Sequence, residues 1–300
     1  MGRARFMNGT TPSLANHVAF LNGRGELPML EILTRWSRAE LYLHGGQVTH
    51  FQKEGEPPLL FTSQCSRFES GAPIRGGIPV VFPWFGRKND RHPSHGFARL
   101  RDWTLSELAT GLDGSLRLVL RMPEVEESPD CPACAVESEL VIRDSLTLEI
   151  RVTNQSDRPF PFELCLHTYL AVGDVRQIWI TGLQDTEYLD AAAGRQRVRD
   201  AEPQLRIQGE VDRIYLNTAR PVEVHDPVLG RTIRVEKTGS ASTVIWNPGP
   251  ERARIMPDLG DDEYLQMVCV ESGNVADNAL TLPPGGTTSM QITLTSRPGT

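Results

Sequence analysis

Lysine is nearly absent from this 300-residue sequence. Lys53, Lys88 and Lys237 are the only lysines among 31 basic residues, which leaves 28 arginines. The 38 acidic residues outnumber the basic ones, and the net charge is −7. A nucleic-acid partner is therefore not expected, because it would need a basic face that neutralises phosphates. Since arginine is the general cation of this chain, a single arginine is a weak indication of function.

Long apolar runs and an export signal are lacking as well. No apolar run approaches the roughly 20 residues that a membrane helix needs. Residues 1–17 are basic but lack the apolar centre of a secretory signal, and Phe6 stands where an N-myristoylation motif has Ser or Thr. We expect a cytoplasmic protein that does not bind membranes.

Cysteine is scarce, and the chain has five, an odd number. Without an export signal, a disulfide framework is not expected. Cys131 and Cys134 form one C-P-A-C pair, but a four-thiolate zinc site needs a second pair, and the sequence has none. A thioredoxin-like redox motif needs a strand followed by a helix, whereas this pair lies in a loop rich in proline and acidic residues. The role of the pair stays open.

Short stretches of alternating apolar and polar residues dominate the rest of the chain. Residues 114–122 alternate in this way, and residues 137–155 are typical of a hairpin with its turn at 143–145. Similar runs follow at 162–172, 177–183, 242–248, 264–273 and 288–296. A helix is expected at most near 257–267. We predict an all-β fold, a large antiparallel β-sandwich that forms one domain over residues 1–300, with residues 1–28 as a loose arm or a first strand.

A histidine lies in the middle of the predicted strand 162–172. Alternation puts His167 on the same face as Cys165 and Tyr169, away from the leucines. One interpretation is a half-buried structural histidine. The other is a general acid or base, because the histidine pKa of about 6.5 lies close to neutral pH.

Two carboxylates are further candidates. Glu271 ends a near-continuous apolar run, directly before Ser272 and Gly273, which we expect to turn the chain. It is either a solvated charge at a strand end or a base at the rim of a cleft, where partial burial would raise its pKa. Asp212 either forms a surface ion pair with Arg213 or accepts hydrogen bonds from sugar hydroxyl groups.

Two other chemistries remain open at this point. His92 and His95 could bind a metal ion together with a glutamate from elsewhere, but a His pair in a Pro-containing loop is a weak metal motif. Cys165 lies two residues before His167 and could act as a nucleophile, although a neighbour along the chain does not by itself activate a thiol.

Five ordered motifs resemble the hexose-6-phosphate mutarotases, or glucose-6-phosphate 1-epimerases, of the galactose-mutarotase-like superfamily. They are PIRGGIPVVFPWFG (73–86), SHGFARLRDW (94–103), LHTYL (166–170), EVDRIY (210–215) and MVCVESG (267–273). The resemblance covers about residues 35 to 296. It implies a β-sandwich of the supersandwich type, with no metal and no organic cofactor.

The resemblance also implies roles for individual residues. His167 resembles the general acid of the family, and Glu271 resembles its general base. Substrate binding is implied for Arg75, Ser94, Arg99 and Asp212. Ser94 departs from the family, where glutamine is common, so its contact is expected to be weaker or bridged by water. We expect His95 to orient a sugar hydroxyl group or to support the pocket.

The implied enzyme is an isomerase that interconverts the α and β anomers of hexose 6-phosphates by acid/base ring opening and reclosure. The guanidinium forks of Arg75 and Arg99 would hold the phosphate, and Gly76 and Gly77 would let the backbone approach the substrate. The alternatives are a 1-epimerase of unphosphorylated aldoses, a non-catalytic sugar-phosphate-binding module and a metal-dependent isomerase. We expect a monomer that needs no cofactor and whose partner is a small hexose 6-phosphate.

Overall fold

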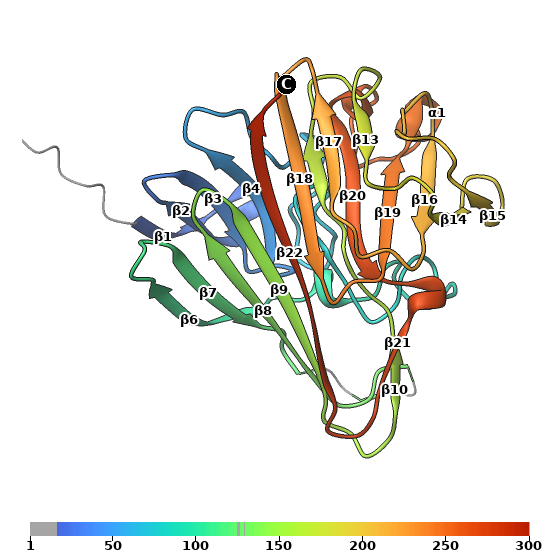
Figure 1. The fold of residues 1–300 in the computed structure, drawn as a ribbon. Helices are drawn as coiled ribbons and strands as arrows, with labels where there is room; N and C mark the ends of the chain where they lie inside the picture. Colours follow the sequence, from blue (N-terminus) through green and yellow to red (C-terminus); the bar gives the residue numbers. More distant parts are fainter. Residues whose placement is uncertain (1–16, 125–126, 129, 300) are drawn as a thin grey trace, which may run out of the picture.

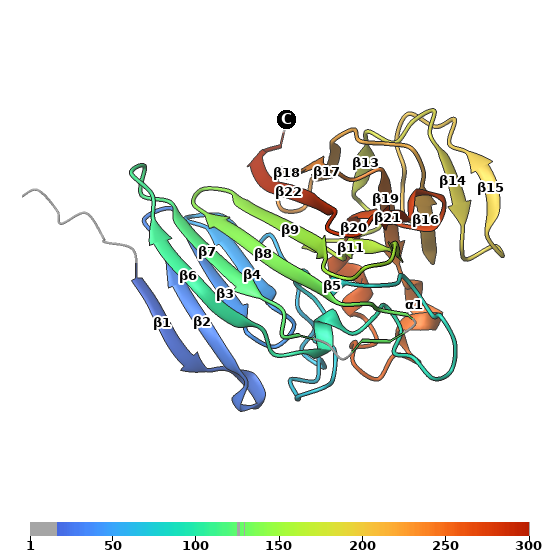
Figure 2. The same cartoon turned by 90° about the horizontal axis from the view of Figure 1, so that it is seen from below.

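Two antiparallel eight-stranded sheets form most of the computed structural model, which describes residues 17–124, 127–128 and 130–299 (Figure 1). A four-stranded sheet lies beside the end of one of these sheets that contains β6 (Thr104–Thr110) and β7 (Leu116–Arg121), as Figure 2 shows. One cluster of buried apolar side chains includes residues from all three sheets, such as Ile32, Leu148 and Ile245. The prediction of an all-β fold with a large antiparallel sandwich is confirmed, whereas the single domain stays a prediction.

The first eight-stranded sheet holds most of the candidate residues. Its strands, in spatial order, are β15 (Gln196–Arg199), β14 (Glu187–Asp190), β16 (Val211–Tyr215), β19 (Ser242–Asn247), β20 (Met267–Asn274), β11 (Leu164–Leu166) and β5 (Val80–Val81), with β12 (Tyr169–Ala171) also paired to β20. The second sheet consists of β13 (Trp179–Thr181), β17 (Val222–Asp226), β18 (Arg231–Thr238), β22 (Thr287–Pro298), β9 (Leu146–Asn154), β8 (Cys134–Ile142), β7 (Leu116–Arg121) and β6 (Thr104–Thr110).

The remaining elements are short. The four-stranded sheet contains β1 (His17–Asn22), β2 (Pro28–Leu33), β3 (Ser37–Tyr42) and β4 (Gln47–Lys53), and β10 (Phe160–Phe162) pairs with β21 (Leu280–Leu282). The helical segments are α1 (Gly249–Ala253) and the 3-10 turns η1 (Arg24–Glu26), η2 (Ala98–Leu100), η3 (Glu263–Gln266) and η4 (Ala276–Asn278). None of the helices in the described ranges has the length and apolar character needed to span a membrane.

The predicted hairpin at 137–155 is formed by β8 and β9. Its turn is closed by the backbone N–H of Arg143, which donates to the carbonyl of Ser145 at 3.0 Å. Burial alternates along both strands, and the paired Leu140 and Leu148 are fully buried. Alternation of this kind places one side of each strand in the core and leaves the other polar.

The prediction that Ser272 and Gly273 turn the chain after Glu271 is wrong. Strand β20 continues to Asn274, and all eight of its residues are buried. The strand continues because it is paired on both sides. Ser272 lies opposite Thr243 of β19 on one side and opposite Leu166 of β11 on the other. Glu271 is therefore a residue of a central strand and lies away from its end.

The predicted strand 162–172 is interrupted. Strand β11 ends at Leu166 and β12 begins at Tyr169, so His167 lies in the break between them. The backbone N–H of His167 donates to the carbonyl of Pro79 at 3.0 Å instead of joining the ladder. The alternation nevertheless holds across the break, because the leucines at 164, 166 and 170 belong to the main core cluster.

Two smaller expectations change. The segment 257–267 contains a single 3-10 turn, η3, and the α-helix lies earlier, at α1, where Pro250 occupies the first turn. Within residues 1–28, β1 begins at His17 and pairs with β2, so this part is a first strand. Residues 1–16 of the arm predicted over 1–28 lie outside the described residues.

Gly76 and Gly77 serve backbone packing and do not open space for a substrate. Both have left-handed φ values, +123° and +60°. A Cβ on Gly76 would lie 2.3 Å from Cα of Thr62, and one on Gly77 would lie 2.1 Å from the carbonyl oxygen of Val48. The expected approach to substrate is therefore replaced by a close approach between chain segments.

We predict that Gly77→Ala lowers the free energy of unfolding by about 2 to 4 kcal/mol, because it combines left-handed strain with a backbone clash. Gly55→Ala is the matched control, since Gly55 has a φ of +75° but a methyl group there would meet nothing within 4 Å beyond its chain neighbours. That control should lose about 1 kcal/mol. Urea denaturation measures both values. Equal losses would show that the contact with Val48 does not matter.

Candidate active site

A cavity of about 560 Å³ gathers all seven residues expected to take part in acid/base catalysis or sugar-phosphate binding. They are Arg75, Ser94, His95, Arg99, His167, Asp212 and Glu271. A second cavity, of about 610 Å³, contains none of them. The seven residues come from segments up to 196 positions apart, between 75 and 271, so the fold rather than the sequence brings them together.

His167 and Glu271 lie side by side in this cavity. Strands β11 and β12, on the two sides of His167, pair with β20 in the same register. Nε2 of His167 lies 3.2 Å from Oε1 of Glu271. The two residues are only 6% and 1% exposed. A group that can donate a proton and a group that can accept one are therefore in contact, and both are almost fully buried.

Burial shifts the two pKa values in opposite directions. Desolvation raises the pKa of Glu271 well above its ordinary value, and the carboxylate of Asp212 adds to this shift. Desolvation lowers the pKa of His167, and the guanidinium groups of Arg99 and Arg75 lower it further. Between these two values the pair holds one proton in total and carries no net charge.

Aromatic rings hold the imidazole of His167. The ring of Tyr169 lies parallel to it, with centroids 4.7 Å apart and an interplanar angle of 11°. The ring of Trp246 meets it edge-on at 5.9 Å. Nδ1 of His167 has no hydrogen-bond partner within the described residues. On the Nδ1 side, stacking on aromatic rings therefore orients this histidine, and no carboxylate of the described residues is hydrogen-bonded to Nδ1.

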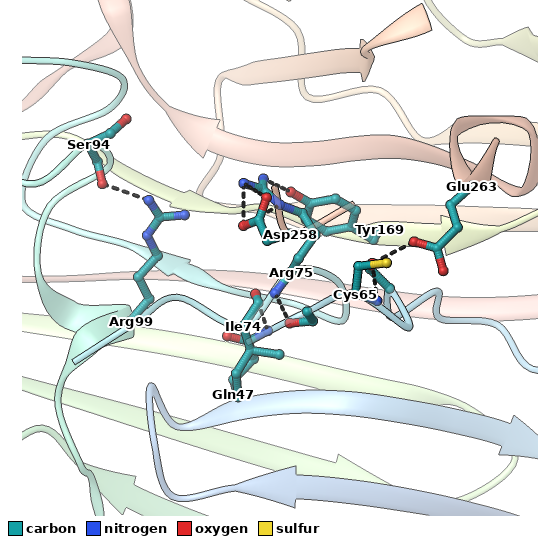
Figure 3. A network of polar contacts seen from close by, with 11 residues as sticks. Gln47, Cys65, Ile74, Arg75, Ser94, Arg99, Tyr169, Asp258 and Glu263 are labelled. Atoms are coloured by element: carbon teal, nitrogen blue, oxygen red, sulfur yellow. Dashed lines mark hydrogen bonds and ion pairs between the residues drawn. The ribbon is translucent and has the colours of Figure 1, made fainter. Parts of the chain in front are cut away.

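Arg75 is already engaged by other side chains, as Figure 3 shows. Its Nε and Nη2 donate to both oxygens of Asp258 at 2.9 to 3.2 Å, and its Nη1 donates to the hydroxyl of Tyr169 at 2.9 Å. Burial opposes the charged form, but the contacts with Tyr169 and Asp258 outweigh it and raise the pKa of Arg75. Arg75 is thus charged, but a carboxylate compensates its charge.

Arg99 differs from Arg75 because no carboxylate among the described residues pairs with it directly. Its Nη2 donates to the backbone carbonyl of Ser94 at 2.7 Å, and its Nε has no partner in the described part of the chain. Burial lowers the pKa of Arg99 to about 10, which leaves the group charged at neutral pH. A buried guanidinium with free donors beside a cavity is suited to an anionic group of a ligand.

His95 supports the pocket wall. Its backbone is left-handed, with a φ of +62°, and its Nδ1 accepts a hydrogen bond from the N–H of Gly86 at 3.3 Å. Its ring packs edge-on against Phe85 at 4.9 Å and against His167 at 5.6 Å. Burial, followed by the charge of Arg99, lowers the pKa of His95 to about 3, so this imidazole is neutral at neutral pH.

Asp212 does not form the surface ion pair with Arg213 that one interpretation of the sequence expected. Because β16 alternates its side chains, Asp212 lines the cavity, while Arg213 lies 3.6 Å from Asp200 and over the ring of Tyr188. Burial raises the pKa of Asp212. Its position is that of an acceptor for groups bound in the cavity.

The comparison with known families agrees with this geometry. Residues 30–295, which include every residue of the site, match the aldose 1-epimerase family. The chain belongs to this family.

Relatives of this aldose 1-epimerase family member extend the match. A protein of Cenchrus ciliaris, named as a candidate glucose-6-phosphate 1-epimerase, is 34% identical over 275 residues, covering 87% of this chain and 82% of the relative. An Escherichia coli K12 protein of the same name is 31% identical over 259 residues, covering 84% and 85%. The crystal structure of a candidate mutarotase from Salmonella typhimurium has a TM-score of 0.85 at 25% identity, covering 97% of this chain and 96% of that one. The mutarotase-like fold is therefore confirmed.

Nucleophilic catalysis by Cys165 does not suit this aldose 1-epimerase site. The Cys165 thiol donates to Oε2 of Glu271 at 3.5 Å, and burial raises its pKa well above 9. A buried thiol of this kind is not a thiolate and is a poor nucleophile. Cys131 and Cys134 are free thiols 3.8 Å apart and do not line the cavity, so their role stays open.

The metal interpretation based on His92 is not favoured either. His92 lies outside the cavity, with its Nε2 3.2 Å from Asp130. In the described ranges, the group that could hold a metal ion is His167, Cys269 and Glu271, whose ligand atoms lie within 4.8 Å of one another. Burial raises the pKa of Cys269, so its thiol stays protonated and is a poor metal ligand. The positive charges of Arg99 and Arg75 act at His167 and would also repel a dication there. We assign no metal, and a metal-free reaction stays a prediction.

Three residues that contact the predicted site residues were not identified from the sequence. Tyr169 lies on the predicted face of His167, and this alternation was a usable signal. Trp246 belongs to a predicted strand but to none of the five motifs. Asp258 lies 183 positions from Arg75, with which it pairs, and no spacing rule connects them.

Proposed function

We propose that this protein is a hexose-6-phosphate 1-epimerase that interconverts the α and β anomers, with glucose 6-phosphate as its reference substrate. The observation that carries the proposal is the buried pair of His167 and Glu271, 3.2 Å apart, in a cavity that also holds the uncompensated Arg99. The names of the Cenchrus ciliaris and Escherichia coli relatives point to the same reaction.

Ring opening uses both members of the pair. The Glu271 carboxylate removes the proton from the anomeric hydroxyl group, and the His167 imidazolium donates a proton to the ring oxygen. The bond between carbon 1 and the ring oxygen breaks as carbon 1 becomes a carbonyl. Each positioned acid or base typically contributes about 10² to 10⁴-fold to such a rate.

Reclosure reverses the two roles. Rotation about the bond between carbons 1 and 2 turns the other face of the aldehyde toward the hydroxyl group of carbon 5. His167 takes the proton from this hydroxyl, and protonated Glu271 returns a proton to the carbonyl oxygen. The pair ends with the single proton with which it began, so no outside acid or base is consumed.

The buried environment suits this cycle. The pair holds one proton, and transfer between Nε2 and Oε1 over 3.2 Å yields the carboxylate and imidazolium that ring opening needs. Because the two residues are only 6% and 1% exposed, bulk water has little access to the proton or to the two charges.

Arg99 is our first choice for the phosphate. Five arginines line the cavity, and three of them have a carboxylate partner: Arg75 with Asp258, Arg87 with Asp90 and Arg252 with Glu210. Arg195 lies on an exposed turn, where water screens its charge. The sequence predicted that Arg75 and Arg99 both hold the phosphate. We now propose that Arg99 binds the phosphate directly and that Arg75 adds its remaining donor.

We predict that Glu271→Gln and His167→Asn each lower the kcat for anomer exchange of glucose 6-phosphate by roughly 10² to 10⁴-fold. NMR exchange spectroscopy measures the rate above that of buffer. His92→Asn is the control, because His92 lies outside the cavity, and it should keep wild-type kcat. A wild-type protein that adds nothing to the buffer rate at high concentration would refute the proposed reaction.

We predict a kcat that falls at both the acid and the alkaline end of the pH range. On the acid side the pair takes up a second proton, and because burial lowers the pKa of His167, this limb lies below the ordinary histidine value of about 6.5. On the alkaline side the pair loses its proton, and because burial raises the pKa of Glu271, this limb lies well above the ordinary glutamate value of about 4.3. An acid limb centred at or above pH 6.5 would contradict the assignment.

We predict that Arg99→Gln raises the KM for glucose 6-phosphate by roughly 10- to 100-fold, the usual value of a charge-assisted contact. The KM for glucose should change by less than about twofold, since glucose has no phosphate to lose. Arg87→Gln is the matched control, because this lining arginine is 73% exposed and paired with Asp90. Equal effects of Arg99→Gln on both sugars would count against the phosphate contact.

A 1-epimerase of unphosphorylated aldoses is the second candidate. The observation that favours it is the compensation of Arg75 by Asp258, which removes one of the two free forks expected for a phosphate. This enzyme would show a kcat/KM for glucose or galactose at least equal to that for glucose 6-phosphate. The steady-state comparison of the three sugars separates the two candidates.

A further inference from the structure

Asp258 lies behind the cavity and touches a residue that lines it. It belongs to the loop between α1 and η3, is 9% exposed, and is not one of the described residues that line the cavity. Its two carboxylate oxygens accept hydrogen bonds from Nε and Nη2 of Arg75 at 2.9 to 3.2 Å. A bidentate pair of this kind fixes both the position and the plane of a guanidinium.

The contact continues from Arg75 to the proposed acid. Nη1 of Arg75 donates to the hydroxyl of Tyr169 (Figure 3). The ring of Tyr169 is stacked on that of His167, with centroids 4.7 Å apart. Asp258, Arg75, Tyr169 and His167 thus form one chain of direct contacts. A change in the plane of the guanidinium moves the tyrosine hydroxyl, and with it the ring on which the imidazole rests.

The loop that carries Asp258 is itself anchored. One oxygen of Glu263 accepts hydrogen bonds from the Ser63 hydroxyl at 2.5 Å and from the N–H of Gly260 at 2.8 Å, and the other accepts from the N–H of Gln64. Residues 63–66, which hold Glu263, also hold the backbone of Arg75, because the N–H of Arg75 donates to the hydroxyl of Ser66 at 2.7 Å. The loop and the arginine are therefore held to one piece of chain.

Asp258 also changes the charge that acts on the imidazole. The titratable or charged groups around His167 are Glu271, Cys269, His95, Arg99, Arg75 and Tyr169. Two of these are guanidinium groups, and both disfavour the imidazolium form that donates the proton. A carboxylate bound to one of the two offsets part of this effect.

We propose that Asp258 is a positioning residue of the epimerase: it holds Arg75 and Tyr169 against the imidazole of His167 and compensates one of the two positive charges near that imidazole. This role rests on the proposed function, because it concerns the same proton donor. Asp258 does not itself touch the substrate. Its effect is therefore on the orientation and the proton affinity of the acid.

Asp258→Asn keeps the shape of the side chain and removes its charge. The variant should lower kcat about tenfold, because the stacked acid is less well held. The acid limb of its kcat–pH profile should move to lower pH by about 0.5 to 1 unit, since the charge of Arg75 is then uncompensated. The assigned imidazole signal of His167 in an NMR titration should move in the same direction, and this second readout does not require activity.

Two further variants separate charge from shape. Asp258→Glu keeps the charge, so it should retain the wild-type acid limb even where kcat falls. Asp261→Asn makes the same chemical change at an exposed position of the same loop and should leave both readouts unchanged. If Asp258→Asn does not fold, the double variant Arg75→Gln/Asp258→Asn removes both charges together, and its His167 titration should stay close to that of the wild type.

The outcomes distinguish the two proposals. A wild-type enzyme that is active, with an Asp258→Asn variant of unchanged kcat and unchanged acid limb, overturns the role of Asp258 alone. Loss of stability in Asp258→Asn without any shift of the His167 titration also overturns it, since a purely structural residue would behave in this way. A wild-type protein without epimerase activity overturns the proposed function, while the NMR titration still decides whether Asp258 controls the charge at His167.

Discussion

The register between β20 and the segment that carries His167 is the constraint on which the site depends. Leu166 lies opposite Ser272 and Tyr169 opposite Cys269, so the residue after Leu166 falls across from Glu271 even though the ladder is broken there. Since side chains alternate along a strand, a slip of one residue would turn the carboxylate to the other face. Pairing of β20 with β19 on its other side, where Val244 lies opposite Glu271, holds the strand at its second edge.

Burial of the acid His167 and the base Glu271 is tolerated because it shifts their pKa values in opposite directions, and both shifts favour the uncharged forms. A lone buried charge is costly, but a pair that holds one proton in total can remain neutral when no substrate is bound. The guanidinium of Arg99 has no such neutralising partner within the described residues, since its Nη2 donates to the backbone carbonyl of Ser94 and its buried Nε has no hydrogen-bond partner. The cavity is thus neutral at the His167–Glu271 pair and positive at Arg99, which is consistent with the phosphorylated sugar that we propose as substrate.

The sequence was most informative where local pattern decides the outcome. Alternation predicted the strands and the face of His167, because a sheet with one buried side imposes that period. It failed at Ser272 and Gly273, which look like a turn but lie in a strand paired on both sides, a property set by residues far away in the chain. The same limit applies to Arg75: a motif gave its place in the cavity, but its carboxylate partner lies 183 positions further on.

The full burial of β20 has a consequence for how the protein opens. All eight residues of this strand are buried, and its amides belong to ladders on both edges. Such amides exchange with solvent through the largest unfolding unit of a protein rather than through local breathing. We therefore expect the carboxylate that we assign to proton transfer to lie on a strand that opens late in unfolding.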